Sequence, residues 1–214
     1  ASYFTVNISS PNTPGLRGLQ SRAELVALLD RLNAARARQA RRPPMLLKIR
    51  NLLSPADVAR LGTLADELHF VDGRVSNPAN LTKQNLQADA ADPKYAESVQ
   101  IVSAALSRSR EFAEFAMPKR VAPPLLCRYE PGMKYGAHAD AALIQFGNFR
   151  IRSDLSCTVF IGDPATYEGG ELVIAVGNQT IAFKGEPGEA IVYPSTTLHE
   201  VAPVSTGRRL VSIT

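Results

Sequence analysis

Short strand-like runs fill the second half of the chain, and they constrain its fold more than any other feature. Each run is rich in β-branched, aromatic or other apolar residues, and turn residues separate one run from the next. The runs cover residues 125–129, 155–161, 171–176, 179–183, 190–193, 199–203 and 210–213. Gly177-Asn178, between the runs 171–176 and 179–183, is a two-residue sequence typical of a β-hairpin turn. Many short strands with such turns predict a β-sandwich or barrel.

The first half of the chain has a helical pattern instead. Ser54 followed by Pro55 is typical of a helix N-terminus. Apolar residues then recur at helical spacing and form one stripe: Val58, Leu61, Leu64, Ala65 and Leu68. Further helices are expected over residues 95–107 and 111–117, and the polar stretch 76–92 is expected to be a loop. We therefore expect an α+β fold in which helices support a β-sheet.

A His-x-Asp sequence, His138-Ala139-Asp140, follows the first strand-like run. In a β-strand, residues i and i+2 face the same side, so both side chains can reach one metal ion. Only three histidines occur in the chain, and His199 begins a later strand-like run. Two imidazoles and one carboxylate leave open coordination positions, as in the facial triad of non-heme Fe(II) oxygenases. The sequence therefore offers His138, Asp140 and His199 as metal ligands and catalytic residues.

Two arginines, Arg208 and Arg209, stand at the start of the last strand-like run. The planar guanidinium suits a carboxylate bound by two parallel hydrogen bonds, and its charge cannot be lost. Because neighbouring residues of a strand point to opposite faces, only one of the two can point toward the metal. The sequence thus predicts one arginine that binds an anionic co-substrate.

The order and spacing of these residues resemble the PKHD-type hydroxylases, bacterial relatives of the prolyl hydroxylases among the Fe(II)/2-oxoglutarate dioxygenases. The resemblance extends from about Met45 to the end of the chain. It rests on these ordered segments: His138-Ala-Asp140, Arg152-Ser-Asp154-Leu-Ser156, Gly169-Gly-Glu-Leu172, Tyr193-Pro194 before His199, and Gly207-x-Arg209. The fold implied by the resemblance is the double-stranded β-helix, or jelly roll, with the helices supporting one sheet.

The resemblance also implies a reaction. Oxidative decarboxylation of 2-oxoglutarate, with Fe(II) and O2, would be coupled to hydroxylation of a small molecule or an exposed peptide side chain. The family's Gly-x-Arg spacing assigns the distal co-substrate carboxylate to Arg209, and Tyr129 matches a tyrosine that bonds the co-substrate carboxylate in prolyl hydroxylases. Asp154 and Ser156 would lie beside the iron. Dependence on ascorbate, vitamin C, is implied in the same way.

Three further segments are compared with the family. Lys83-Gln84-Asn85-Leu86 resembles a family segment that is expected near the substrate entrance or in a plain surface loop. Residues 141–149 replace a region that begins with polar residues in relatives, which would alter substrate selection. Family members continue beyond the strand that carries Arg209, so the domain 45–214 is expected to be truncated at its C-terminus.

Residues 1–44 predict a separate β-α-β-like segment. Residues 3–8 are strand-like, and a helix with Leu25, Leu28, Leu29 and Leu32 on one face begins after Ser21. Residues 1–49 resemble a fragment of quinone-dependent dihydroorotate dehydrogenase, with Asn7 and Asn12 at pyrimidine-contacting positions and Ser10 at the catalytic base. That enzyme is an eightfold β/α barrel, and only one unit is present here. The fragment is therefore expected to be non-functional, with Ser10 idle and no bound FMN.

Composition excludes several other classes of protein. The formal net charge of +4 comes from residues 1–44, which hold seven arginines against two acidic residues, and no aromatic residues accompany the arginine cluster, so nucleic-acid binding is not expected. No apolar run approaches the roughly 20 residues of a membrane span, and no secretory signal is visible. Cys127 and Cys157 are expected to be reduced core residues of a cytoplasmic protein. His69 is expected at a helix end or on the surface.

Two readings compete with the dioxygenase. A non-catalytic, cupin-like metal-binding module would keep His138, Asp140 and His199 but not turn over 2-oxoglutarate. A pyrimidine-pathway flavoenzyme would need the barrel units that are missing after Ile49. The ordered set of motifs between residues 138 and 209 favours the dioxygenase.

Overall fold

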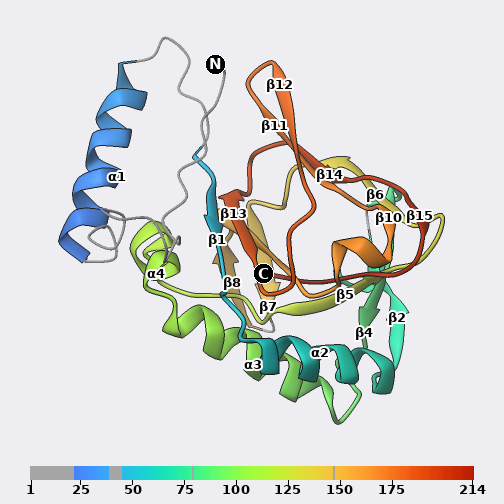
Figure 1. Cartoon of the computed structure of the whole chain (residues 1–214). Helices are drawn as coiled ribbons and strands as arrows, with labels where there is room; N and C mark the ends of the chain where they lie inside the picture. Colours follow the sequence, from blue (N-terminus) through green and yellow to red (C-terminus); the bar gives the residue numbers. More distant parts are fainter. Residues whose placement is uncertain (1–21, 39–44, 79, 147) are drawn as a thin grey trace.

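The computed structural model of this chain describes residues 22–38, 45–78, 80–146 and 148–214 (Figure 1). Its helices and strands are, in chain order, α1 (Arg22–Ala37), β1 (Leu47–Ile49), α2 (Pro55–Glu67), β2 (Phe70–Asp72), η2 (Gly73–Ser76), β3 (Lys83–Gln84), β4 (Leu86–Ala88), α3 (Tyr95–Arg108), α4 (Arg110–Ala116), β5 (Leu125–Tyr129), β6 (Lys134–His138), β7 (Leu143–Phe146), β8 (Phe149–Arg152), β9 (Leu155–Phe160), η3 (Pro164–Thr166), β10 (Glu168–Gly169), β11 (Leu172–Val176), β12 (Gln179–Phe183), β13 (Ala190–Pro194), β14 (His199–Val201), β15 (Val204–Thr206) and β16 (Arg209–Ile213). The predictions made for residues 3–8, Ser10 and Ser21 lie outside the described residues.

Two antiparallel sheets form the body of the structure. The larger sheet has the strand order β1-β13-β9-β16-β5-β4-β2, and the smaller has the order β12-β11-β14-β6-β3. Neighbouring strands pair antiparallel in both sheets. Two packed antiparallel sheets with crossing connections are the architecture of a jelly roll. The predicted α+β fold with a double-stranded β-helix is confirmed.

Strand alternation divides the side chains of the larger sheet between two apolar cores. On β5, Leu126 belongs to the core shared with helices α2, α3 and α4, whereas Cys127 and Tyr129 belong to the core shared with the smaller sheet. Figure 1 shows α2 and α3 running along one side of the sheets. The helices therefore cover the outer face of the larger sheet, and the space between the sheets remains for a site.

Helix α2 begins where the sequence predicts. The Ser54 hydroxyl accepts a hydrogen bond from the Asp57 backbone N–H, and the Asp57 carboxylate accepts one from the Ser54 N–H. This reciprocal capping box satisfies two backbone groups that a helix start otherwise leaves unpaired. The predicted stripe is buried at Leu61, Leu64 and Ala65. None of the described helices has the length and apolar character needed to cross a membrane.

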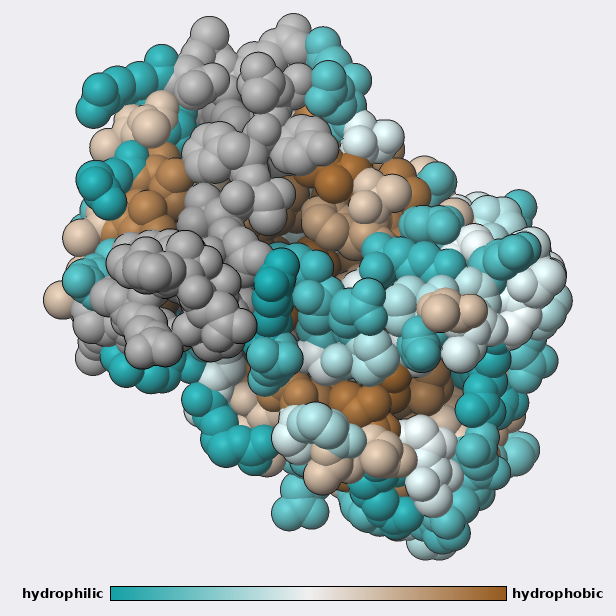
Figure 2. All heavy atoms as spheres, in the orientation of Figure 1, coloured by the Kyte–Doolittle hydropathy of each residue, from teal (hydrophilic) through white to brown (hydrophobic). Residues whose placement is uncertain are grey.

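The N-terminal helix α1 packs against this body. Leu25 is buried in the core that the helices share with the larger sheet, and Leu29 is partly buried beside it. Figure 2 shows hydrophobic residues gathered on the side of α1 that turns toward the rest of the molecule. Strand β1 then pairs antiparallel with β13 at the edge of the larger sheet. Because the first strand of the expected β-α-β unit lies outside the described residues, that unit remains a prediction.

All seven strand-like runs form strands, and each end lies within two residues of its predicted position. The turn Gly177-Asn178 joins β11 to β12, with Val176 opposite Gln179. The expectation of a loop over residues 76–92 is wrong in its centre, because β3 and β4 lie there. Strands of two or three residues are too short to show a period-two pattern, and their pairing partners come from distant parts of the chain.

Candidate functional site

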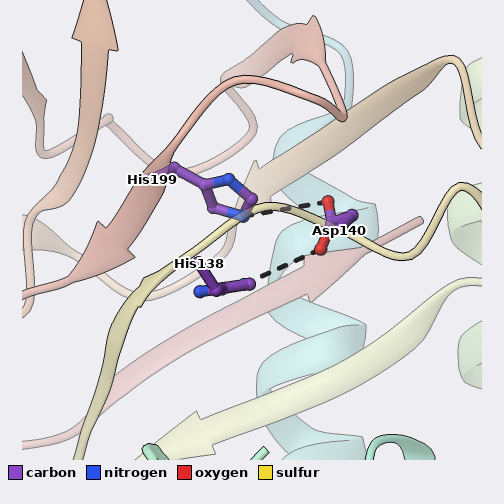
Figure 3. Close-up of side chains that lie close together, drawn as sticks. All are labelled: His138, Asp140 and His199. Carbon is purple, nitrogen blue, oxygen red and sulfur yellow. Dashed lines mark ion pairs between the residues drawn. The ribbon is translucent and has the colours of Figure 1, made fainter.

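Two strands of the smaller sheet bring the three predicted ligands together (Figure 3). His138 ends β6, His199 begins β14, and the two residues pair directly across the sheet. His138 Nε2 lies 3.7 Å from Asp140 Oδ1, and His199 Nε2 lies 3.7 Å from Asp140 Oδ2. One donor atom from each of the three residues lies within 4.8 Å of the others. The predicted grouping of these residues in space is therefore present.

Asp140 reaches this position differently from the sequence argument. It lies beyond the end of β6 rather than inside a strand, so the i, i+2 alternation is not what orients it. Its backbone N–H donates a 2.9 Å hydrogen bond to the Ser195 carbonyl. The Ser156 hydroxyl donates a second hydrogen bond, of 2.5 Å, to Asp140 Oδ2. These two bonds hold the carboxylate toward the histidines.

The two imidazoles are oriented by the backbone. His138 Nδ1 lies 2.8 Å from the Gly136 carbonyl, and His199 Nδ1 lies 2.9 Å from the Thr197 carbonyl. A carbonyl accepts only, so each Nδ1 carries the proton and each Nε2 keeps a lone pair directed at Asp140. Burial is the main cause that lowers the pKa of His138, which favours the neutral imidazole. Neutral imidazoles with a free Nε2 are the form that binds metals.

Aromatic rings pack around the imidazoles. The Tyr135 ring stacks on His138 with ring centroids 3.7 Å apart, and the Tyr193 ring meets His199 edge-on at 4.9 Å. Burial raises the pKa of both phenols, so they stay neutral. The rings restrict the imidazoles to one orientation and shield them from solvent.

The chemistry of the donor set fits one divalent transition metal. Each histidine lies 3.7 Å from a different oxygen of Asp140, which is within the roughly 4.2 Å that two metal–ligand bonds of about 2.1 Å can span. Two nitrogen donors and one carboxylate on one side of an ion leave the other side open. The arrangement can therefore hold a metal and still accept a chelating ligand.

Arg209 lies inside the larger sheet, facing the smaller one. Its side chain is 1% exposed, and it pairs across the sheet with Tyr129, whose ring centroid lies 4.9 Å from the guanidinium carbon. Within the described residues it forms no ion pair, and its buried Nε has no hydrogen-bond partner. Arg208 points outward, where its Nη1 lies 2.6 Å from Asp66 Oδ1. As predicted, the side chains of the two arginines point to opposite faces of the larger sheet.

Of the two side chains expected beside the iron, only Ser156 contacts the triad. Asp154 is exposed and pairs with Arg152 at 2.9 Å. His69 lies on the surface beside Asp89, as expected. Cys127 and Cys157 are free and buried, and burial raises their pKa values to about 11 and about 12, so both thiols are protonated.

A second buried cation, Lys83, lies near the triad, and no pattern in the sequence pointed to it. Lys83 is 3% exposed, and its Nζ donates a 2.6 Å hydrogen bond to Ser76 Oγ. The same Nζ lies 5.5 Å from the centre of the Tyr135 ring. Burial lowers the Lys83 pKa, and the nearby Asp140 carboxylate opposes that shift. No alternation in the sequence marks this segment as a strand, because Gln84 is polar like Lys83, Asn85 and Gln87.

Comparisons with known sequences agree with this geometry. A sequence profile described as the 2OG-Fe(II) oxygenase superfamily matches residues 124–214. A PKHD-type hydroxylase of Sphingopyxis alaskensis is 49% identical over 170 residues, which cover 79% of this chain and 77% of that protein. A PKHD-type hydroxylase of Thioalkalivibrio sulfidiphilus is 40% identical over 167 residues, covering 77% of this chain and 75% of that protein.

A comparison with solved structures supports the fold. The prolyl hydroxylase from Trichoplax adhaerens, solved in complex with a peptide fragment of the hypoxia inducible factor oxygen degradation domain, superposes with a TM-score of 0.61. The superposition covers 97% of this chain and 94% of that chain, at 14% sequence identity. At this identity the likeness concerns the arrangement of strands and helices alone.

Proposed function

Since this chain belongs to the PKHD-type hydroxylases and is a 2-oxoglutarate-dependent dioxygenase, we propose a role for each residue of its site. His138, Asp140 and His199 hold Fe(II). Arg209 and Tyr129 bind the distal carboxylate of 2-oxoglutarate. The substrate that is hydroxylated is a small molecule or an exposed peptide side chain.

One observation carries this proposal: a buried arginine, with no acidic partner among the described residues, shares the space between the sheets with a three-residue metal-ligand set. Burying an unpaired charge is costly, so the arrangement favours an anionic ligand that neutralises it. A dicarboxylate with a keto group can chelate a metal at one end and meet a guanidinium at the other. 2-Oxoglutarate, the co-substrate of the family, has this form.

When bound, Fe(II) and 2-oxoglutarate supply the oxidative decarboxylation that activates O2 for hydroxylation. The residues of this chain bind and orient these two groups and exclude water from them. The Gly136 and Thr197 carbonyls fix the two imidazoles, and Ser156 fixes Asp140. Tyr135 and Tyr193 limit solvent access to the ligand atoms. The positions of the ligands are thereby set before the metal binds.

The substrate class rests on related folds. The Trichoplax adhaerens prolyl hydroxylase was solved with a peptide fragment, and a structural relative from Streptomyces hygroscopicus was solved with nickel, 2-oxoglutarate and hygromycin B. Structures that share this fold thus include one solved with a peptide and one solved with a small molecule. These two classes are the ones to screen.

Anaerobic addition of Fe(II) and then 2-oxoglutarate tests the proposal. We expect a weak visible charge-transfer band when 2-oxoglutarate is added, and slow release of succinate once O2 is admitted. Omitting 2-oxoglutarate should abolish both signals. Iron binding without the band would support a metal-binding module in place of the dioxygenase site. Succinate release measured against peptides and small molecules would then identify the substrate class.

We also expect a chain beginning at Met45 to keep the 2-oxoglutarate turnover of the full chain. Every residue with a role in the site lies after Met45, so the truncation removes no ligand. It does remove buried Leu25, and losing one buried leucine costs roughly 1.5–3 kcal/mol of folding stability. Uncoupled succinate production and thermal unfolding of both chains check this prediction. A large loss of turnover at a temperature where both chains are folded would contradict it.

A further inference from the structure

A short segment between the two sheets presents three buried polar side chains on one face. Lys83, Asn85 and Gln87 are 3%, 3% and 6% exposed, whereas Gln84 between them is exposed. Lys83 pairs across the smaller sheet with Tyr135, and Gln87 pairs across the larger sheet with Cys127. The segment therefore passes from one sheet to the other with its buried face toward the space between them.

Asn85 lies in register with the two residues proposed to bind the distal carboxylate. Leu86 pairs with Arg128 in the antiparallel register of β4 and β5, so the preceding residue, Asn85, comes next to Tyr129. Tyr129 in turn pairs with Arg209 on β16. Asn85, Tyr129 and Arg209 thus form one row across three neighbouring chain segments, on the inner face of the larger sheet.

The carboxamide of Asn85 lacks hydrogen-bond partners. Both Nδ2 and Oδ1 are buried, and neither has a partner among the described residues. Burial raises the pKa values of Tyr129 and Cys127, and Asn85 lies close enough to oppose that rise in each, although hydrogen-bond geometry is met with neither. Buried amides are almost always hydrogen-bonded, so two unpaired atoms in one side chain favour a polar group bound beside it.

The backbone beside Asn85 is shaped to admit this side chain. A Cβ atom on Gly73 would lie 1.9 Å from Asn85 Oδ1, so a larger residue at position 73 would force the carboxamide to move. The Gly73 N–H also donates a 2.8 Å hydrogen bond to the Asn85 backbone carbonyl. The carboxamide is thus packed in one place although its own polar atoms are unpaired.

We propose that Asn85 binds the co-substrate. Its carboxamide N–H donates a hydrogen bond to the distal carboxylate that Arg209 and Tyr129 also bind. The inference rests on the proposed function. A carboxylate offers about four acceptor positions, so it can accept from a guanidinium, a phenol and an amide together. An anion in this row would pair the Asn85 Nδ2 and the Arg209 Nε, neither of which has a hydrogen-bond partner in the described part of the chain.

Calorimetric titration of the Ni(II)-loaded full chain tests the inference without turnover. 2-Oxoglutarate and pyruvate share the keto acid that chelates a metal, but pyruvate has no distal carboxylate. Asn85→Leu should weaken 2-oxoglutarate binding by roughly tenfold or more, the effect of one hydrogen bond to a charged group. Pyruvate binding should not change. Gln84→Leu, one residue away on the exposed face, should behave as the wild-type chain does.

Thermal unfolding of the metal-free proteins separates ligand binding from a structural role. Asn85→Leu should melt at the same temperature as the wild type or higher, because it removes a buried unpaired amide and keeps a similar volume. An unchanged preference for 2-oxoglutarate over pyruvate in this variant would overturn the inference, but it would leave the proposed carboxylate-binding site at Arg209 intact. If the wild-type chain showed no preference for 2-oxoglutarate over pyruvate, that result would overturn the proposed carboxylate-binding site at Arg209, and the inference with it.

Discussion

Replacement of His138 or His199 by alanine is expected to abolish iron binding and, with it, 2-oxoglutarate decarboxylation. Each imidazole supplies one of the donor atoms that lie within 4.8 Å of one another, and its Nδ1 is already committed to a backbone carbonyl. Two remaining ligands hold a labile ion poorly. Iron content after anaerobic reconstitution, measured together with succinate release, checks the prediction.

His69→Ala is the matched control. This third histidine is exposed, and among the described residues its ring forms an ion pair with Asp89. It should bind iron as the wild-type chain does. Circular dichroism and thermal unfolding should show that all three variants are folded. Wild-type iron stoichiometry in both the His138 and the His199 variants would remove the basis for the metal site.

Arg209→Ala is expected to raise the concentration of 2-oxoglutarate needed for half-maximal turnover by about a hundredfold. The guanidinium is 1% exposed, and a charge-assisted pair in such a place is worth about 3 kcal/mol. That free energy corresponds to roughly two factors of ten in affinity. The 2-oxoglutarate dependence of succinate release and direct calorimetric titration measure the change independently. Iron binding without co-substrate should not change.

Two further variants sharpen this test. Arg208→Ala removes the neighbouring arginine, which is exposed and pairs with Asp66, and it should leave the 2-oxoglutarate requirement near the wild-type value. Arg209→Lys keeps the charge but not the planar pair of donors, so its effect should be intermediate. A strong effect at Arg208 with none at Arg209 would show that the opposite face of β16 meets the co-substrate.

The larger elements of the fold could be predicted from local patterns. The apolar stripe from Val58 to Leu68 and the cap at Ser54 mark helix α2, because a helix repeats every 3.6 residues and needs a partner for its first N–H groups. The turn Gly177-Asn178 marks the β11–β12 hairpin, because a tight turn needs positive φ, and Gly177 has a φ of 64°. Both signals depend only on neighbouring residues.

Other parts of the site could not be predicted in this way. Asp140 is oriented by the carbonyl of Ser195 and the hydroxyl of Ser156, which come from distant positions in the chain. Ser156 and Asp154 are equivalent as sequence candidates, yet only Ser156 contacts the triad. Strand alternation alone would give them the same face, but β9 begins at Leu155, so Asp154 lies outside the strand and is exposed while Ser156 lies within it.

By itself the sequence predicted His138, Asp140 and His199 as one group of metal ligands, a sandwich or barrel of short strands, and opposite faces for Arg208 and Arg209, because residue chemistry, spacing and alternation are properties of the chain. The resemblance to the family added the jelly roll and the choice of Arg209. Tertiary structure alone decided what surrounds them. The row of Asn85, Tyr129 and Arg209 exists because three segments distant in the chain pair in one register. Burial without a partner is likewise a property of the packed sheets, since it depends on which atoms of distant segments come into contact.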